Sequence, residues 1–111
     1  MSMKYLMLVC VDPSIKLPPG DDRDVEPWVD EMTRRGTRLV GSPVARREHA
    51  TTVRVRDGEL SVTDGPFAEA KEQMVGFDLI ECADLDEAIE IASKHPLARR
   101  GAMDIRPFID V

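Results

Sequence analysis

The residues best suited to chemistry are three charged side chains near one tight turn, together with a distant histidine. The turn is Asp64-Gly65-Pro66-Phe67, and Lys71, Glu72 and His95 follow it along the chain. Asp64 or His95 could move a proton, because an imidazole titrates near neutral pH and burial raises the pKa of a carboxylate. Lys71 could hold an anionic ligand or stabilise a developing oxyanion. We therefore expect these four side chains to face one cleft, with Asp64 and His95 as the candidate catalytic residues.

Each of these side chains also has a purely structural interpretation, which stays open. Asp64 can cap the amides of its own turn. Lys71 and Glu72 can form a solvated pair in a loop. His95 precedes Pro96 at the end of an expected helix, where it can place a favourable charge at the negative end of the helix dipole.

Three further residues are candidates for ligand binding. Gly65 can take a positive φ before Pro66, which produces a sharp bend in the chain. Phe67 is expected to anchor the loop in the core, with a stacking platform for a ligand as the alternative. Trp28 lies on the apolar stripe of an expected helix, so it belongs either to the core or to the wall of a pocket.

Length and composition predict one folded domain and disfavour some partners. The chain has 111 residues, of which 42% are hydrophobic and 32% charged, a balance typical of a single globular domain over residues 1–111. Its net charge of −6 repels phosphate backbones and anionic lipid, so we expect neither a nucleic-acid nor a membrane partner. The apolar run at residues 5–11 is too short to span a bilayer and lacks the flanks of a signal peptide, which predicts a cytoplasmic protein.

Cysteine and histidine usage predicts neither a metal nor another cofactor. Cys10 and Cys82 lie in apolar, strand-like runs, where free thiols usually behave as small buried hydrophobes. The sequence has two histidines, His49 and His95, and no cysteine or carboxylate cluster lies at metal-ligand spacing around them. Neither a zinc site nor a haem site is therefore expected.

The first part of the chain reads as strand, helix and strand. Residues 4–11 are apolar at nearly every position, which is typical of a strand covered on both faces. Asp21 or Asp22 can cap a helix over residues 22–35. Its expected buried stripe comprises Val25, Trp28, Val29 and Met32. A short second strand begins at residues 39–40 and is expected to break at the Gly-Ser-Pro that follows.

A β-hairpin is predicted over residues 51–63 because Asp57-Gly58 is the strongest two-residue hairpin signal. In the register that this loop sets, apolar residues meet across the strands on one face, and polar residues occupy the other. The predicted cross-strand pairs are Arg56 with Glu59, Val55 with Leu60, Val53 with Val62 and Thr52 with Thr63.

The last part of the chain reads as strand, helix and strand again. Residues 74–82 form a strand pattern, and Asp84 with Glu87 three residues later forms a capping arrangement for a helix. The expected buried stripe of that helix comprises Leu85, Ala88, Ile89 and Ala92. The helix must stop before Pro96, and residues 102–109 alternate as a final strand.

This order of elements predicts a ferredoxin-like α+β sandwich, βαβ-hairpin-βαβ, with two helices on one face of an antiparallel sheet. The other face of the sheet would be uncovered in a monomer, although the first strand is apolar on both faces. The same face of a second copy would cover it, which predicts a two-fold symmetric homodimer. A different partner protein is the alternative.

Several segments along the whole chain carry a family resemblance. They are residues 3–8, 51–58, 62–69, 71–73, 84–88, 95–96 and 105–108. In this order they resemble the YCII-related family and, more narrowly, its branch named for the Asp-Gly-Pro-Phe (DGPF) motif. The resemblance implies the dimeric α+β barrel superfamily, which includes binding modules, cofactor-independent enzymes and haem proteins.

The resemblance also implies a site that this chain does not reproduce. In the better-studied YCII-like branch, a proposed acid–base pair joins an aspartate before a proline, near the end of the second helix, to a histidine on the first helix. Here His95 precedes Pro96, and residues 22–35 contain no histidine. Two functions stay open: a binding or regulatory module for a small, for example anionic, metabolite, and a cofactor-independent isomerase, hydrolase or oxygenase that uses Asp64 or His95. The missing nucleophile and base pair favours the binding module.

Overall fold

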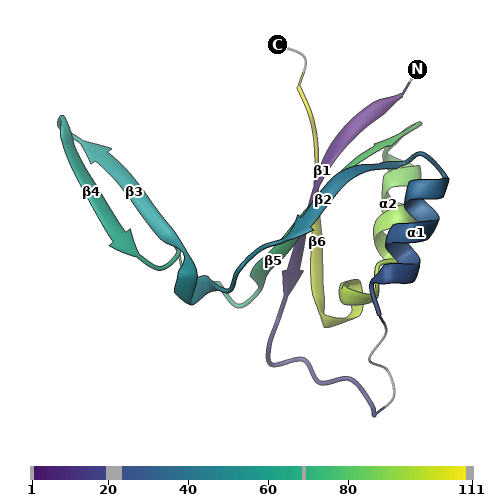
Figure 1. Cartoon of the computed structure of the whole chain (residues 1–111), viewed down its shortest axis with the longest axis horizontal. Coiled ribbons are helices and arrows are strands. Elements are labelled where there is room, and N and C mark those ends of the chain that lie inside the picture. The colour runs from purple at the N-terminus through teal and green to yellow at the C-terminus, as the bar shows by residue number, and fades with distance from the viewer. Residues whose placement is uncertain (1, 20–23, 69, 110–111) are drawn as a thin grey trace.

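The main body of the protein is a four-stranded antiparallel sheet with both helices on one face, as a computed structural model of residues 2–19, 24–68 and 70–109 shows (Figure 1). The strands are β1 (Met3–Val11), β2 (Arg38–Pro43), β5 (Gln73–Cys82) and β6 (Gly101–Pro107), in the order β2-β5-β1-β6. The helices are α1 (Glu26–Arg34) and α2 (Leu85–Ser93). This is the ferredoxin-like α+β fold that the sequence predicts.

The core lies between the helices and the sheet face that they cover. Alternate residues of β1, namely Tyr5, Met7 and Val9, are buried there, as strand periodicity requires. The intervening residues Leu6 and Leu8 point to the opposite face, where they are only half-buried. The sheet therefore has one covered face and one open apolar face.

The predicted hairpin forms a separate two-stranded sheet that projects from the body (Figure 1). Its strands are β3 (Thr51–Arg56) and β4 (Glu59–Asp64), and we call residues 51–64 the hairpin arm. Asp57 and Gly58 have φ angles of 54° and 79°, as the tight loop demands. All four predicted cross-strand pairs are confirmed.

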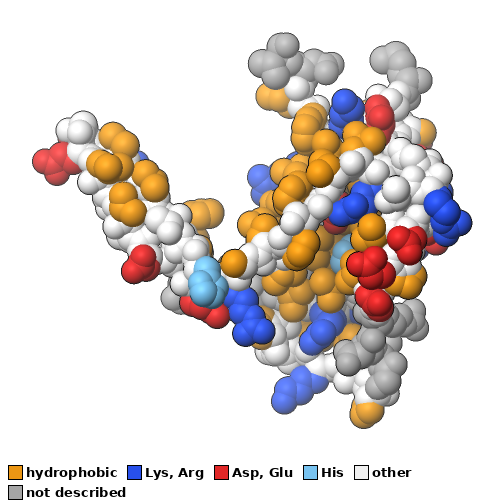
Figure 2. All heavy atoms as spheres, viewed as in Figure 1, with side chains coloured by type: hydrophobic (Ala, Val, Ile, Leu, Met, Phe, Trp, Pro, Cys, Tyr) orange, Lys and Arg blue, Asp and Glu red, His pale blue; other side chains and the backbone are white. Residues whose placement is uncertain are grey.

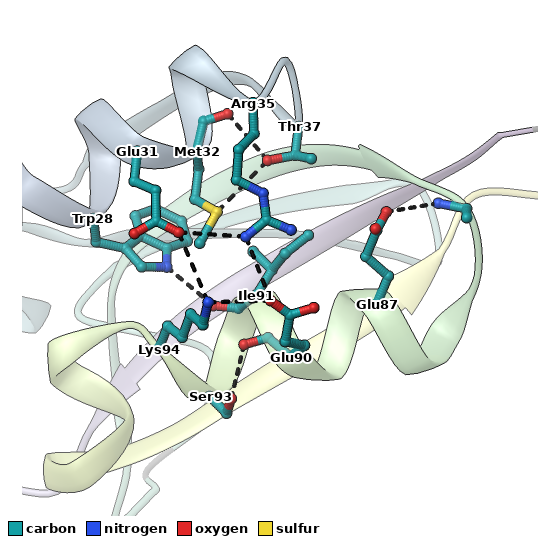
Figure 3. A network of polar contacts seen from close by, with 11 residues as sticks. Trp28, Glu31, Met32, Arg35, Thr37, Glu87, Glu90, Ile91, Ser93 and Lys94 are labelled. Atoms are coloured by element: carbon teal, nitrogen blue, oxygen red, sulfur yellow. Dashed lines mark hydrogen bonds and ion pairs between the residues drawn. The ribbon is translucent and has the colours of Figure 1, made fainter.

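Polar contacts hold the two helices side by side (Figure 3). Trp28 of α1 donates from Nε1 to the carbonyl of Ile91 in α2 over 3.0 Å. Arg35, just beyond α1, lies 3.4 Å from both Glu31 and Glu90, so its guanidinium bridges the helices. The wall that α1 forms over the sheet is therefore fixed in place.

The capping arrangement predicted for α2 is confirmed. Asp84 accepts a hydrogen bond from the amide of Glu87 at 2.9 Å, and the Glu87 carboxylate accepts one from the amide of Ala83 at 2.9 Å. The first helix starts differently, because α1 begins at Glu26 with Pro27 in its first turn. The predicted caps, Asp21 and Asp22, lie outside the described residues.

Strand β2 is longer than expected. It runs through Gly41, Ser42 and Pro43, where the sequence predicted a break. Proline is tolerated because β2 is an edge strand of the sheet, so one side of it has no ladder to donate to. The extra length brings residues of β2 over the site described below.

The prediction of which residues of α2 are buried was also wrong in part. Leu85 and Ile89 are half exposed, and the buried positions are Ala88, Ile91 and Ala92. The helix is rotated relative to the expected stripe because Ile91, and not Ile89, packs beneath α1.

Candidate functional site

A cavity of about 290 Å³ lies between α1, β2, β5 and the short helix η2 (Pro96–Arg100). Its walls are mainly apolar, and a few polar side chains enter it from different elements. The apolar lining includes Val9, Val25, Val29, Val75 and Leu97, and the polar lining includes Glu26, Arg38, Ser42, Asp78 and His95. An apolar pocket with a few convergent polar groups is the usual composition of a small-molecule site.

Arg38 and Asp78 form an ion pair in this cavity. They lie on the adjacent strands β2 and β5, and Nε of Arg38 donates to Oδ1 of Asp78 over 2.7 Å. Asp78 is buried, and burial raises the pKa of its carboxyl group, while the guanidinium offsets part of that rise. Arg38 uses only Nε in this contact, so among the described residues its two terminal amino groups have no hydrogen-bond partner and can serve a ligand.

Gly41 leaves the space that this ion pair occupies. A Cβ atom on Gly41 would collide with Oδ1 of Asp78, and it would lie 2.6 Å from a terminal nitrogen of Arg38. A larger residue would therefore displace the pair. The glycine that the sequence suggested as a strand breaker is instead a strand residue that makes room for charged side chains.

His95 enters the cavity from the loop between α2 and η2. Its side chain is 3% exposed, and its ring lies 4.6 Å from the Trp28 ring, centroid to centroid. Nδ1 accepts a hydrogen bond from the amide of Leu97 at 3.0 Å, which places the proton of the neutral ring on Nε2. Burial lowers the pKa of His95 to about 4, so the ring is neutral at pH 7. A neutral ring places no positive charge at the end of the helix.

The turn that contains Asp64 lies in a different part of the molecule, at the base of the hairpin arm. Gly65 has a positive φ of 96°, donates to the carbonyl of Ala50 at 2.8 Å and accepts from the Thr52 hydroxyl at 2.7 Å. The carboxylate of Asp64 is exposed, and within residues 2–19, 24–68 and 70–109 it accepts no hydrogen bond. Gly65 thus fixes where the arm leaves the body, and Asp64 faces solvent.

Phe67 does not anchor the turn in the core as expected. Phe67 is instead 78% exposed. The turn is held through its backbone instead, because the carbonyl of Phe67 accepts a hydrogen bond from Arg54 at 3.2 Å. Hydrogen bonds to the arm thus replace the apolar contact that the sequence suggested.

Lys71 pairs with an aspartate that the sequence did not single out. Its Nζ lies 3.4 Å from Oδ2 of Asp12, a buried residue at the end of β1. Two hydrogen bonds from Ser14 lower the pKa of Asp12, and Lys71 lowers it further. The ion pair ties the loop before β5 to the body, while Glu72 remains exposed beside it.

The structure therefore separates the residues that the sequence grouped. His95 lines the cavity under α1, Asp64 and Gly65 line a hollow at the base of the arm, and Glu72 and Phe67 line another. Trp28 is buried and packs on His95, so it supports the cavity from the core.

Sequence reasoning missed Arg38 and Asp78, although one signal was present. Asp78 interrupts the otherwise apolar stretch Gly76-Phe77-Asp78-Leu79-Ile80 in a strand with a buried face. A charged residue at such a position must be paired, and Arg38 is its partner. The sequence does not show which residue that partner is, because the two lie on strands separated by the hairpin arm.

Comparison with known proteins links the chain to one family. The YCII-related domain matches residues 3–111. A relative from Rhizobium meliloti (strain 1021), described as an uncharacterised protein, is 49% identical over 71 residues. That alignment covers 60% of this chain and 57% of the relative, so the chain spans little more than half the length of this relative.

Neither a membrane-spanning helix nor a metal-ligand cluster is found among the described residues. No helix in the described part of the chain is long and apolar enough to cross a membrane. Among residues 2–19, 24–68 and 70–109, no group of three or more His, Cys, Asp or Glu side chains is arranged to hold a metal ion.

Proposed function

The chain belongs to the YCII-related domain family, and on that premise we propose that it is a small-molecule binding or regulatory module. One observation carries the proposal: the cavity under α1 combines an apolar lining with a buried ion pair and a neutral histidine. Its volume of about 290 Å³ is close to the lower end of the range for ligand pockets, roughly 300–1,000 Å³.

The polar groups in the cavity define the chemistry of the ligand. The terminal amino groups of Arg38 and Nε2–H of His95 are donors, so the ligand presents acceptors such as a carboxylate or a carbonyl oxygen. The ion pair with Asp78 holds the guanidinium of Arg38 in position. Val29 and Val75 would contact the apolar part of the ligand. The proposed ligand is thus a small organic anion or carbonyl compound.

A second candidate function is cofactor-independent catalysis of proton transfer, and one observation favours it. Burial keeps His95 neutral in the same cavity as Asp78, whose pKa is raised, so two groups of altered acidity face one space. In this version His95 moves the proton and Arg38 stabilises the developing negative charge. Asp64 lies outside this cavity, and its use as the acid or base would require a different site.

A thermal-shift screen with small carboxylates and carbonyl compounds tests the proposed function. We expect at least one compound to raise the melting temperature of the wild-type protein and to lose most of that effect in Arg38→Lys. Lysine keeps the charge but lacks the planar fork of donors that a carboxylate would engage. Turnover of a bound compound, lost in His95→Asn with binding retained, would favour the catalytic version.

Arg34→Lys is the matched control for this screen. Arg34 is exposed at the end of α1 and does not line the cavity. The control should respond to ligand like the wild type. Equal ligand responses in Arg38→Lys and the wild type would place the binding site elsewhere.

We also propose a homodimer in which the open face of the main sheet packs against a second copy. The half-buried apolar residues Leu6 and Leu8 support this, since exposed apolar faces of this kind usually mark interfaces. The Asp64-Gly65-Pro66-Phe67 turn supports assignment to the DGPF branch of the family. Two free cysteines, Cys10 and Cys82, support a cytoplasmic location.

A further inference from the structure

We infer that the hairpin arm, residues 51–64, is a clasp that packs its apolar face on a second copy of this chain. The inference rests on the homodimer proposed above and adds an interface that the open sheet face alone does not provide. It concerns a surface remote from the ligand cavity, so the two proposals can fail separately.

One face of the arm is an unpartnered apolar stripe. Val53, Val55, Leu60 and Val62 point to the same side, and their side chains are 58–69% exposed. The opposite face carries polar residues, including Arg54 and Ser61. An antiparallel ribbon with one apolar and one polar face favours packing on another surface, because removing its apolar side chains from water lowers the free energy.

The arm has little support from its own body. The contacts that tie it down lie at its base, where Thr52 bonds to Gly65 and the amide of Gly65 bonds to Ala50. An isolated two-stranded hairpin is marginally stable in water. Contact with another surface would supply the packing that the arm lacks.

The body carries a second apolar surface of matching character. Leu6, Leu8, Phe77 and Leu79 form cross-strand pairs on the open face of the sheet, and Val40 and Met74 at its margins are 52% and 48% exposed. Figure 2 shows hydrophobic side chains on the arm and on the flank of the body nearest to it, with open space between them. One molecule thus presents two apolar surfaces, one on the arm and one on the open face of the sheet.

A second copy of this chain is the occupant that fits both walls at once. In a two-fold dimer, the open sheet face of each copy would pack on that of the other, and the arm of each copy would extend over its partner. This one arrangement would bury both sheet faces and both arm stripes. The four stripe residues are uncharged, and the charged residues beside the apolar centre of the open face stand in oppositely charged pairs, Lys4 with Glu81 and Arg106 with Asp104, so two copies can meet there although each carries a net charge of −6. A stable interface takes roughly 800 Å² from each partner, and the apolar stripe of the arm adds to the area that the open sheet face can bury.

Sedimentation velocity over a range of micromolar concentrations tests the inference. We expect a wild-type dimer and a dimer dissociation constant raised more than about tenfold in Leu60→Asp. Ser61→Asp is the matched control, because it places the same charge on the neighbouring residue and the opposite face of the arm. It should dimerise like the wild type.

A second variant excludes loss of the hairpin itself as the cause. Val53→Thr with Val62→Thr changes a cross-strand pair while keeping β-branched side chains of nearly the same shape, so the strands should form as before. This double variant should also weaken the dimer, and circular dichroism should show an intact fold.

Three outcomes decide the matter. Weakened dimers in Leu60→Asp and in the threonine pair, with Ser61→Asp unaffected, support the clasp. A wild-type dimer that Leu60→Asp leaves unchanged, or that both aspartate variants weaken equally, overturns it. A wild-type monomer of 12.4 kDa overturns both the clasp and the homodimer, and leaves ligand binding under α1 to be judged by its own screen.

Discussion

Arg38 and Asp78 reach from adjacent strands to form an ion pair beneath α1, with Nε and Oδ1 only 2.7 Å apart. Asp78 is buried, and a neighbouring glycine leaves the room that the pair needs. On the other face of the same sheet, Arg106 and Asp104 form an exposed pair at 2.9 Å. The fold therefore contains two Arg–Asp pairs of similar geometry in opposite environments.

Replacing the arginine should have different effects on the two pairs. Arg38→Ala leaves a buried carboxylate without its counterion, which we expect to lower the free energy of unfolding by about 3 kcal/mol. Arg106→Ala removes a pair that is solvated in the single chain, so it should change the stability of the monomer little. Urea denaturation of both variants, at concentrations where the chain is monomeric, measures the contrast. Equal losses would show that the Arg38–Asp78 pair is as well solvated as the surface pair.

His95 should make the stability of the protein depend on pH. Its pKa falls from 6.5 to about 4 on folding, so between these values the unfolded chain takes up a proton that the folded chain does not. The contribution of this group to the free energy of unfolding is fully present above about pH 6.5. As the pH falls from 6.5 toward 4, protonation of the unfolded chain lowers the free energy of unfolding by up to about 3 kcal/mol. Denaturant midpoints measured across this range should show the loss.

Two histidine variants separate this effect from the titration of other groups. His95→Asn keeps an acceptor for the Leu97 amide but does not titrate, so the decline between pH 6.5 and 4 should become shallower. His49→Asn, at an exposed position, should keep the wild-type profile. A profile that His95→Asn leaves unaltered would argue against a neutral, buried imidazole.

Asp84 should stabilise α2 through its cap. Asp84→Ala removes the acceptor for the Glu87 amide, and we expect a loss of about 1 kcal/mol in the free energy of unfolding. Asp86→Ala, two residues later in the first turn of α2, removes a similar charge without a capping bond and is the control. Thermal or urea unfolding that ranks the two variants equally would contradict the capping role.

Local patterns in the sequence predicted much of the fold. Asp57-Gly58 fixed the register of the arm because the loop allows only one pairing, and Asp84 with Glu87 identified the start of α2. The placement of both helices on one face of the sheet followed from the order of elements and the handedness of crossovers. These features depend on interactions between residues close in sequence or on general rules of chain connection.

The candidate site was harder to predict because it depends on contacts between distant residues. Arg38 and Asp78 are forty positions apart, and only the pairing of β2 with β5 brings them together. His95 was recognised as a chemical group, but its neutral state follows from burial under Trp28, which no local pattern reveals. Asp64 was grouped with His95 because its turn motif is conspicuous in the sequence, whereas in the structure this turn lies at the base of the arm, apart from the cavity.

The central claim is that a small acceptor-bearing ligand binds in the cavity under α1. Mapping of amide chemical shifts in an isotope-labelled sample, titrated with a compound from the thermal-shift screen, tests it most directly. We predict perturbations at residues 38–43, 75–78 and 95–97, which line or adjoin the cavity, and their loss in Arg38→Lys. Perturbations confined to the arm, or unchanged in Arg38→Lys, would contradict the claim.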